Sequence, residues 1–428
     1  MYKNRDSRSG PPHETEEVET VLVRGARQLL TLRNSSSPRR GAALSDLGII
    51  HDGAVLIRAG KVVESGPSRR LENVAKARGA HEIDATGRVV LPGFVDGCTQ
   101  LLSPRTPALS AREEGIKSGF RRDLRELSAT PVRRLRARAQ VLLAGMARHG
   151  TTTVSALVHH GSNRLSELKA LRVLAGLDGK PLDLIRGYYG AQFVPPELSE
   201  EPWAYAESVC NKTLPLLARR NLARFVGVNC RVSELSAARR ILACAKELGF
   251  GLRLYAGANT AAVRLAIEME ASSLSLDSIE PGEIGALARA RTIALLAPAS
   301  VLSRRLDRYP PARALIDSGA AVALASGYGL AQSPTYNMQM VIALACSQMG
   351  MSPAEAICAA TANAAHALGC ADRAGSLQPG RRADILLLNV QDYRDIGHHF
   401  GINHVHMVLK NGVTIYKEGE VAVGSANS

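Results

Sequence analysis

The chain has 428 residues, of which 46% are hydrophobic and 21% are charged. This balance is typical of a globular protein and excludes a largely disordered chain, and the length accommodates one large domain with a smaller one beside it. The formal net charge is +14, and seven arginines lie between residues 121 and 138. Because no set of aromatic residues is interleaved with these arginines, we interpret them as a solvated helix surface and favour this over a nucleic-acid partner, which stays open as an alternative.

The termini and the cysteines indicate the compartment. Residues 1–20 are polar and lack the apolar segment of a signal peptide, so we expect a disordered tail. No stretch approaches the roughly 18 consecutive apolar residues that a membrane span requires. The seven cysteines are scattered and never spaced as Cys-x-x-Cys, which indicates neither a disulfide framework nor a zinc knuckle. We therefore expect a cytoplasmic protein without a membrane segment.

Short strand patterns with glycine-centred turns occur near both ends of the chain. Residues 21–23, 53–63 and 81–84 are the first group, and residues 383–388 and 405–416 are the second. Asn411-Gly412 separates two apolar runs and predicts a two-residue hairpin. We expect the two groups to form one composite β-sandwich from residues 21–90 and 374–422.

Residues 91–373 alternate short apolar runs with helical stretches, which predicts a parallel (β/α)₈ barrel of the TIM type in the α/β class. The first strand is expected at 89–98, and Cys98 and Gln100 follow at its end, pointing the same way into the catalytic face. Helices are expected at 132–148, 233–248, 261–271, 283–289 and 353–368. The other seven strands are expected at 151–157, 184–192, 225–230, 252–256, 273–279, 292–298 and 321–327.

Ten short motifs occur in one order along this barrel and its return to the β-sandwich. They are LPGFVD at 91–96, GTTTV at 150–154, SELK at 166–169, GAQFVP at 190–195, PPAR at 310–313, MQMV at 338–341, MSPAEA at 351–356, GSLQPG at 375–380, FGIN at 400–403 and VLKNG at 408–412. With these motifs, the chain resembles the imidazolonepropionase family of the amidohydrolase superfamily. The resemblance implies ring opening of an imidazolone by a metal-dependent hydrolase that forms a homodimer.

The resemblance also implies a metal site, usually zinc or iron, whose role is to supply hydroxide by lowering the pKa of bound water to about 7. The family places a His-x-His pair after the first strand, one His after the fifth strand and an Asp after the eighth. A His at the sixth strand and a Glu near the fifth move protons. The corresponding residues here are Cys98 and Gln100 for the pair, Tyr255 for the fifth-strand His, Ala258 for the Glu, Ser278 for the sixth-strand His and Gly327 for the Asp.

None of these positions keeps the ligand or proton carrier of the family, and Cys98 is the one good metal ligand among them. His159 and His160 follow the second strand, but adjacent side chains tend to point apart. We therefore expect no metal cofactor and predict an inactive homologue that binds a small molecule, regulates another protein or acts as its partner.

Two further interpretations of the barrel mouth remain open. In the first, a metal-free hydrolase of a cyclic amide or related non-peptide C–N bond uses Cys98 as its nucleophile, with His160 or Tyr255 as the base. In the second, the mouth is a polar pocket that holds a small anionic or cyclic-amide ligand. The residues expected in this pocket are Cys98, Gln100, Arg105, His160, Gln192, Tyr255 and Ser278.

Overall fold

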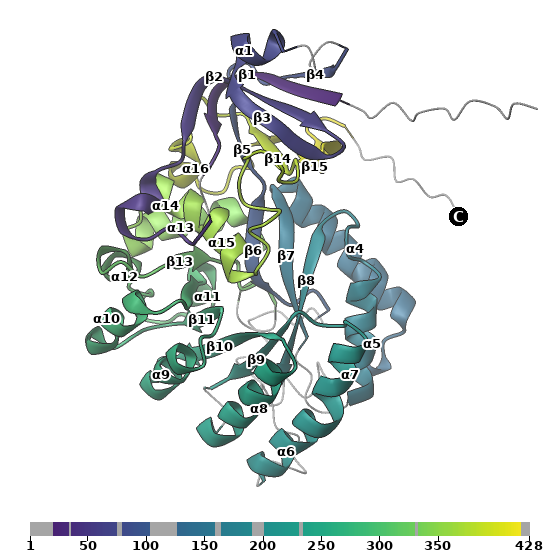
Figure 1. Ribbon diagram of the computed structural model, residues 1–428, viewed down its shortest axis with the longest axis vertical. Helices are drawn as coiled ribbons and strands as arrows, with labels where there is room; N and C mark the ends of the chain where they lie inside the picture. Colours follow the sequence, from purple (N-terminus) through teal and green to yellow (C-terminus); the bar gives the residue numbers. More distant parts are fainter. Residues whose placement is uncertain are drawn as a thin grey trace, which may run out of the picture.

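The computed structural model describes residues 20–33, 36–74, 79–102, 126–158, 164–190, 201–230, 234–329 and 333–420. Figure 1 shows a barrel with a smaller β domain at one end of it. Eight parallel strands form the barrel sheet, with neighbours in chain order from β6 to β13. They are β6 (Phe94–Thr99), β7 (Thr151–Val158), β8 (Asp183–Gly190), β9 (Phe225–Asn229), β10 (Gly251–Gly257), β11 (Ser273–Leu276), β12 (Ile293–Leu296) and β13 (Val322–Leu324). The predicted (β/α)₈ barrel is confirmed.

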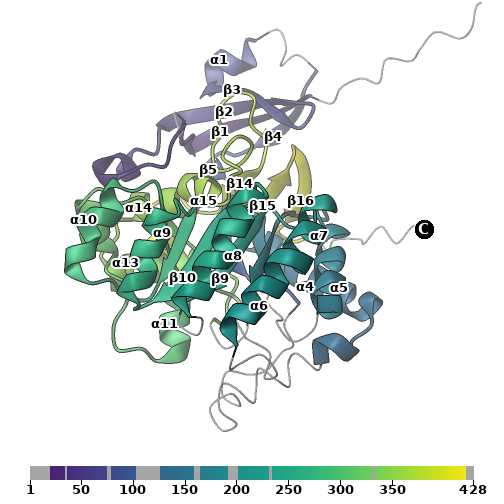
Figure 2. The ribbon, with the colours of Figure 1, turned by 60° about the horizontal axis from the view of Figure 1, so that its bottom comes forward.

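Helices surround the barrel strands (Figure 2). The buried residues of α4 recur at helical spacing, whereas the arginines of this helix face solvent. The buried residues are Leu135, Ala139, Leu142, Leu143, Met146 and Ala147. None of the described helices is both long enough and apolar enough to cross a membrane. The helices are α4 (Val132–Arg148), α5 (Arg164–Ala175), α6 (Pro202–Ser208), the π-helical turn η4 (Val209–Thr213), α7 (Leu214–Arg219), α8 (Leu235–Glu247), α9 (Thr260–Glu268), α10 (Pro281–Arg289), α11 (Pro298–Arg304), α12 (Ala312–Asp317), α13 (Met338–Met349), α14 (Pro353–Ala359) and α15 (Ala362–Ala367).

The β domain combines both ends of the described chain in one mixed sheet, whose order is β16-β15-β14-β5-β1-β2-β3, with β4 paired to β1. One buried cluster contains Val23 and Ile57 together with Leu387 and Leu409, so the strands from the two ends share a core. This arrangement fits the predicted composite sandwich. The elements are β1 (Thr20–Leu30), η1 (Gly41–Ser45), β2 (Ile49–Arg58), β3 (Lys61–Pro67), α1 (Ser68–Glu72), β4 (His81–Asp84), β5 (Val89–Pro92), β14 (Ile385–Leu388), α16 (Asp395–His398), β15 (Val405–Lys410) and β16 (Val413–Lys417).

Two local predictions have clear outcomes. The hairpin between β15 and β16 is confirmed, because Asn411 and Gly412 have φ values of 50° and 78°, as a type I′ turn requires. The helical stretch expected over 353–368 is present as two helices, α14 and α15. Thr361, with φ −130° and ψ −90°, is not helical and separates α14 from α15.

The single first strand expected over 89–98 is wrong, because at Gly93 the chain passes from the sheet of the β domain to the sheet of the barrel. Strand β5 pairs with β1 and β14 in the β domain, whereas β6 pairs with β7 in the barrel. The Gly93 N–H donates to the carbonyl of Asp384 at 2.9 Å. A Cβ at this position would lie 2.1 Å from Oγ1 of Thr152, so the crossing has no room for a side chain.

A buried ionic cluster fastens the β domain to the start of β8. Lys410 Nζ donates to the carboxylates of Asp384 at 2.6 Å and Asp183 at 3.0 Å, and Arg382 also donates to Asp183. The side chains of Lys410 and Asp384 are each 4% exposed. Burial raises the pKa of Asp384, and the Lys410 ammonium opposes this shift. The carboxylate therefore depends on Lys410 to stay charged in the interior.

We expect Lys410→Met to lower the free energy of unfolding by about 3–5 kcal/mol, because it leaves a buried carboxylate without its cation. Urea denaturation followed by circular dichroism measures the change. The matched control is Lys417→Met, whose lysine is partly exposed on β16 and pairs with Glu420. The control should cost less than about 1 kcal/mol. Equal losses in the two variants would show that the buried cluster contributes no special stability.

A second buried carboxylate closes the barrel. Asp96 on β6 accepts hydrogen bonds from the Ser326 N–H at 2.9 Å, from the Ser326 hydroxyl and from the Cys98 N–H at 3.3 Å. Ser326 lies just beyond β13, so these bonds join the first and last strands. Burial raises the pKa of Asp96 from 3.8 to about 6, although the hydrogen bonds from Ser326 and Cys98 favour the charged form.

A raised carboxyl pKa means that the folded state holds the proton more tightly than the unfolded state. The contribution of Asp96 to stability therefore falls as the pH rises from 3.8 to about 6. We expect the free energy of unfolding of Asp96→Asn, taken relative to that of the wild type, to rise by about 3 kcal/mol as the pH increases from about 4 to about 7. The exposed Asp307→Asn change should show no such trend. A pH-independent difference for Asp96→Asn would contradict the assignment.

Candidate functional site

The floor of the barrel mouth is organised by Arg253 on β10, whose side chain is almost wholly buried. Its guanidinium donates to the Ser155 hydroxyl on β7 at 2.7 Å, to the Gly97 carbonyl on β6 at 2.7 Å and to the Ser273 hydroxyl on β11 at 3.0 Å. One side chain therefore ties together strands from four positions around the barrel. Cys98, Tyr255 and Ser275 come one or two residues after these bonded positions, so Arg253 holds the backbone on which they stand.

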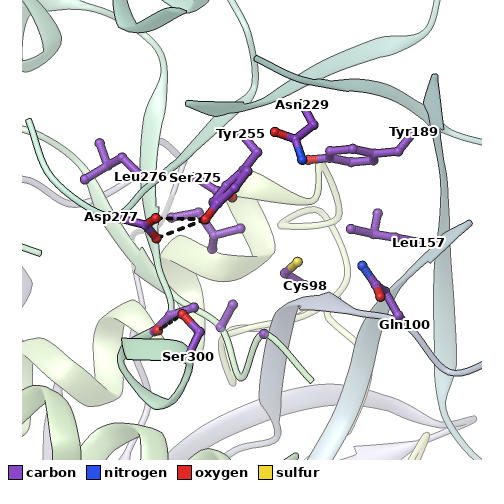
Figure 3. Close-up of a pocket in the computed structure, with 14 residues that line it drawn as sticks. Cys98, Gln100, Leu157, Tyr189, Asn229, Tyr255, Ser275, Leu276, Asp277 and Ser300 are labelled. Atoms are coloured by element: carbon purple, nitrogen blue, oxygen red, sulfur yellow. Dashed lines mark hydrogen bonds between the residues drawn. The ribbon is translucent and has the colours of Figure 1, made fainter. Parts of the chain in front are cut away.

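Above this floor, at the C-terminal ends of the strands, lies a cavity of about 40 Å³. Figure 3 shows Cys98, Gln100, Tyr189, Asn229 and Tyr255 around the same space. Cavities of this kind at barrel mouths are the usual location of function in this fold. The full lining is Cys98, Gln100, Leu157, Tyr189, Asn229, Tyr255, Ser275, Leu276, Asp277, Leu295, Ala297, Ser300, Ala325 and Gly327.

The structure places four of the seven residues that the sequence suggested for a pocket. Cys98, Gln100 and Tyr255 line the cavity together, whereas the lining includes Asp277 rather than its neighbour Ser278. The remaining three expected residues, Arg105, His160 and Gln192, lie outside the described residues.

Tyr255, Asp277 and Arg304 form a hydrogen-bonded network on one wall of the cavity (Figure 3 shows the first two). The Tyr255 hydroxyl donates to the two Asp277 carboxylate oxygens at 3.1 and 2.9 Å. Arg304 Nη1 donates to the same oxygens at 3.1 and 3.0 Å and to the Tyr255 hydroxyl at 3.0 Å. The side chains of Arg304 and Asp277 are 16% and 17% exposed. Their charges are thus matched within the wall itself.

Sequence reasoning missed Asp277 and Arg304. A carboxylate at the end of the strand expected over 273–279 was a usable signal for Asp277, because polar residues at strand ends face the mouth. Arg304 is the last residue of α11, and no local pattern relates it to β10 or β11. Its role follows only from the three-dimensional arrangement.

Cys98 and Gln100 are held differently at the end of β6. Cys98 is half-buried, and burial raises the pKa of its thiol to about 11 even though Arg253 opposes the shift. The thiol is therefore protonated at neutral pH. The Gln100 N–H donates to the Tyr328 carbonyl at 2.8 Å, which fixes the backbone at the point where β6 meets the segment after β13.

Tyr189 on β8 contributes a neutral hydroxyl to the opposite wall. Burial raises the pKa of the Tyr189 hydroxyl above its ordinary value of 10.0. Its ring packs over Gly227 on β9, where a Cβ would lie 2.4 Å from the ring. The absence of a side chain at Gly227 therefore makes room for an aromatic residue within the barrel.

These residues do not fit the zinc or iron site that the fold family implies. Among the parts of the chain that the structure describes, no group of three or more His, Cys, Asp or Glu side chains is arranged to hold a metal ion. Cys98 is a protonated thiol, and the carboxylate of Asp277 is engaged by Arg304. A catalytic zinc site usually needs three such ligands and an open position.

Known proteins resemble this chain over most of its length. Imidazolonepropionase from Solibacter usitatus is 37% identical over 412 residues, which cover 91% of this chain and 97% of the relative. Imidazolonepropionase from Geobacillus kaustophilus is 34% identical, with 94% and 99% covered. The sequence profile of the Amidohydrolase family matches residues 283–415.

Solved structures show the same fold at much lower identity. A zinc-bound variant of atrazine chlorohydrolase from Arthrobacter aurescens superposes with a TM-score of 0.74 at 16% identity, covering 93% of this chain and 95% of the other. Guanine deaminase from E. coli gives a TM-score of 0.71 at 17% identity, covering 94% and 100%. The fold and the relatives agree, and the chain belongs to the imidazolonepropionase family of amidohydrolases.

Proposed function

We propose that this chain is a non-catalytic member of its family, which has lost metal-dependent hydrolysis and acts as a regulatory or partner protein. The network of Tyr255, Asp277 and Arg304 carries the proposal. Tyr255 stands at the position where the family has its fifth-strand His, and its hydroxyl is bonded to a carboxylate that already has a cation. On the wall that would hold a metal, the hydrogen-bonding groups of Tyr255 and Asp277 are thus already paired with each other and with Arg304.

The size of the cavity supports the same proposal. About 40 Å³ is space for about three water molecules, whereas pockets for small organic ligands are usually 300–1,000 Å³. The described residues leave much less space than such a pocket, and we infer that a small inorganic anion fits it better than a cyclic amide. We therefore favour a partner role over binding of a cyclic amide at the barrel mouth.

Metal analysis and a turnover assay test the proposal together. We expect the purified protein, incubated with zinc or iron and then desalted, to retain far less than one metal ion per chain. We also expect no hydrolysis of imidazolone propionate, the compound after which its relatives are named. One tightly held metal ion per chain, lost in Cys98→Ala, would overturn the proposal.

A gain-of-ligand variant is the matched control. Cys98→His, Gln100→His and Tyr255→His combined restore the imidazole ligands of the family and release Asp277 from Tyr255. We expect this variant to retain zinc well above the wild-type level, because three imidazoles suffice for a zinc site. Equal zinc content in the variant and the wild type would mean that these positions do not control metal binding.

The alternative, a metal-free hydrolase with Cys98 as nucleophile, requires a thiolate. With a pKa of about 11, about one thiol in ten thousand is ionised at pH 7. We expect alkylation of Cys98 by iodoacetamide, followed by peptide mass spectrometry, to be slow at neutral pH and to accelerate steadily into the alkaline range. Fast alkylation at neutral pH, with a rate that no longer increases at higher pH, would instead support Cys98 as a nucleophile.

The assembly and location of the protein remain predictions. The resemblance implies a homodimer, which light scattering would report as a mass of twice that of one chain. We also propose a cytoplasmic location, which fractionation of cells that express the full chain would test.

A further inference from the structure

We propose that the outer surface of α4 and α5 docks an acidic polypeptide segment of a partner protein. The inference goes beyond the proposed function and does not rest on the loss of metal chemistry, because this surface lies outside the barrel. Residues 131–180 contain nine Lys and Arg and two Asp and Glu, so this stretch has a charge of +7, half of the +14 of the whole chain.

The charge is gathered on two neighbouring helices, which lie side by side at the edge of the barrel in Figures 1 and 2. Arg133, Arg134 and Arg136 on α4 and Arg172 on α5 are exposed. A Cβ at Gly176 would lie 3.6 Å from Nη2 of Arg136 and 3.7 Å from the Arg172 carbonyl. Arg136 therefore reaches across to the end of α5, and the four arginines form one surface, the α4–α5 basic surface.

The ion pairs of these arginines can be followed in the described part of the chain. Arg138, on the same helix, pairs with Glu126 at 3.0 Å. Within the described ranges of the chain, no carboxylate lies within ion-pair distance of Arg133, Arg134 or Arg136. Their guanidinium groups are thus available to the carboxylates of another molecule, with which arginine forms two parallel hydrogen bonds.

The positive charges at the N-terminal end of α4 destabilise this helix. The N-terminal end of a helix is electropositive and is stabilised by acidic residues. The first turn of α4 has no acidic residue and instead contains Arg133 and Arg134, with Arg136 following. The stability of α4 does not explain these residues, and a local rule broken at the expense of stability is typical of a functional surface.

The surroundings favour a protein rather than a nucleic acid. No Phe, Tyr or Trp occurs in residues 131–180, so the two helices themselves supply no such ring on which bases could stack. Two apolar side chains of the same helices, Val132 and Leu165, are 43% and 71% exposed. Exposed aliphatic groups beside arginine, with little lysine, are the composition of protein interfaces.

Fluorescence anisotropy of labelled probes tests the proposal with the full chain at physiological ionic strength. The probes are a glutamate-rich peptide and single-stranded and duplex DNA oligonucleotides of matched charge. We expect the peptide to bind more tightly than either DNA. The variant Arg133→Glu/Arg134→Glu/Arg136→Glu should weaken peptide binding roughly tenfold or more. It should also raise the Tm, because acidic residues then occupy the first turn of α4.

The control variant is Arg27→Glu/Arg58→Glu/Arg69→Glu, which makes the same change of charge at three exposed arginines of the β domain. We expect it to leave peptide binding within about twofold of wild type, since distant exposed charges are screened. Equal weakening in both variants, or no peptide binding by the wild type, would overturn the proposal. Tighter binding of either DNA would also overturn it and would identify a nucleic acid as the partner.

Discussion

The structure depends on the hydrogen bonds of one buried cation, Arg253. Its guanidinium bonds Gly97 on β6, Ser155 on β7 and Ser273 on β11, so it fixes the relative heights of these strands and of β10. Few buried guanidinium groups persist without such bonds, because removing a charge from water is costly. Cys98, Tyr255 and Ser275 of the mouth follow within two residues of these positions, so Arg253 supports this part of the cavity from below.

The cavity wall shows how polar side chains at a barrel mouth satisfy one another. A carboxylate at Asp277 would be costly in this half-buried place, and Arg304 together with the Tyr255 hydroxyl offsets the cost. The network also occupies space, which agrees with a cavity of about 40 Å³. Polar residues at the ends of barrel strands here serve packing and charge balance, and this supports the proposed non-catalytic role.

The same reasoning about charge balance separates the interior from the outer surface. Inside, the cations Lys410 and Arg304 meet carboxylates at close range. Outside, Arg133 and Arg134 stand at a helix end that disfavours positive charge. Charges that are satisfied within the molecule contribute to its fold, whereas the outer arginines suit an interaction with another molecule. The two proposals therefore rest on different parts of the barrel.

The sequence by itself determined the features that depend on local rules: the strand and helix order of the barrel, the Asn411-Gly412 hairpin and the place of Cys98 at a strand end. Only the tertiary structure decided the rest. The crossing between the sheets needs glycine at position 93, because Thr152 leaves no room for a side chain. Arg304 contacts Asp277, which is 27 residues away in the sequence, and Lys410 contacts Asp183, which is 227 residues away. Periodicity and turn chemistry are written in neighbouring residues, but the choice of an ionic partner depends on which distant side chains the closed barrel brings within a few ångströms.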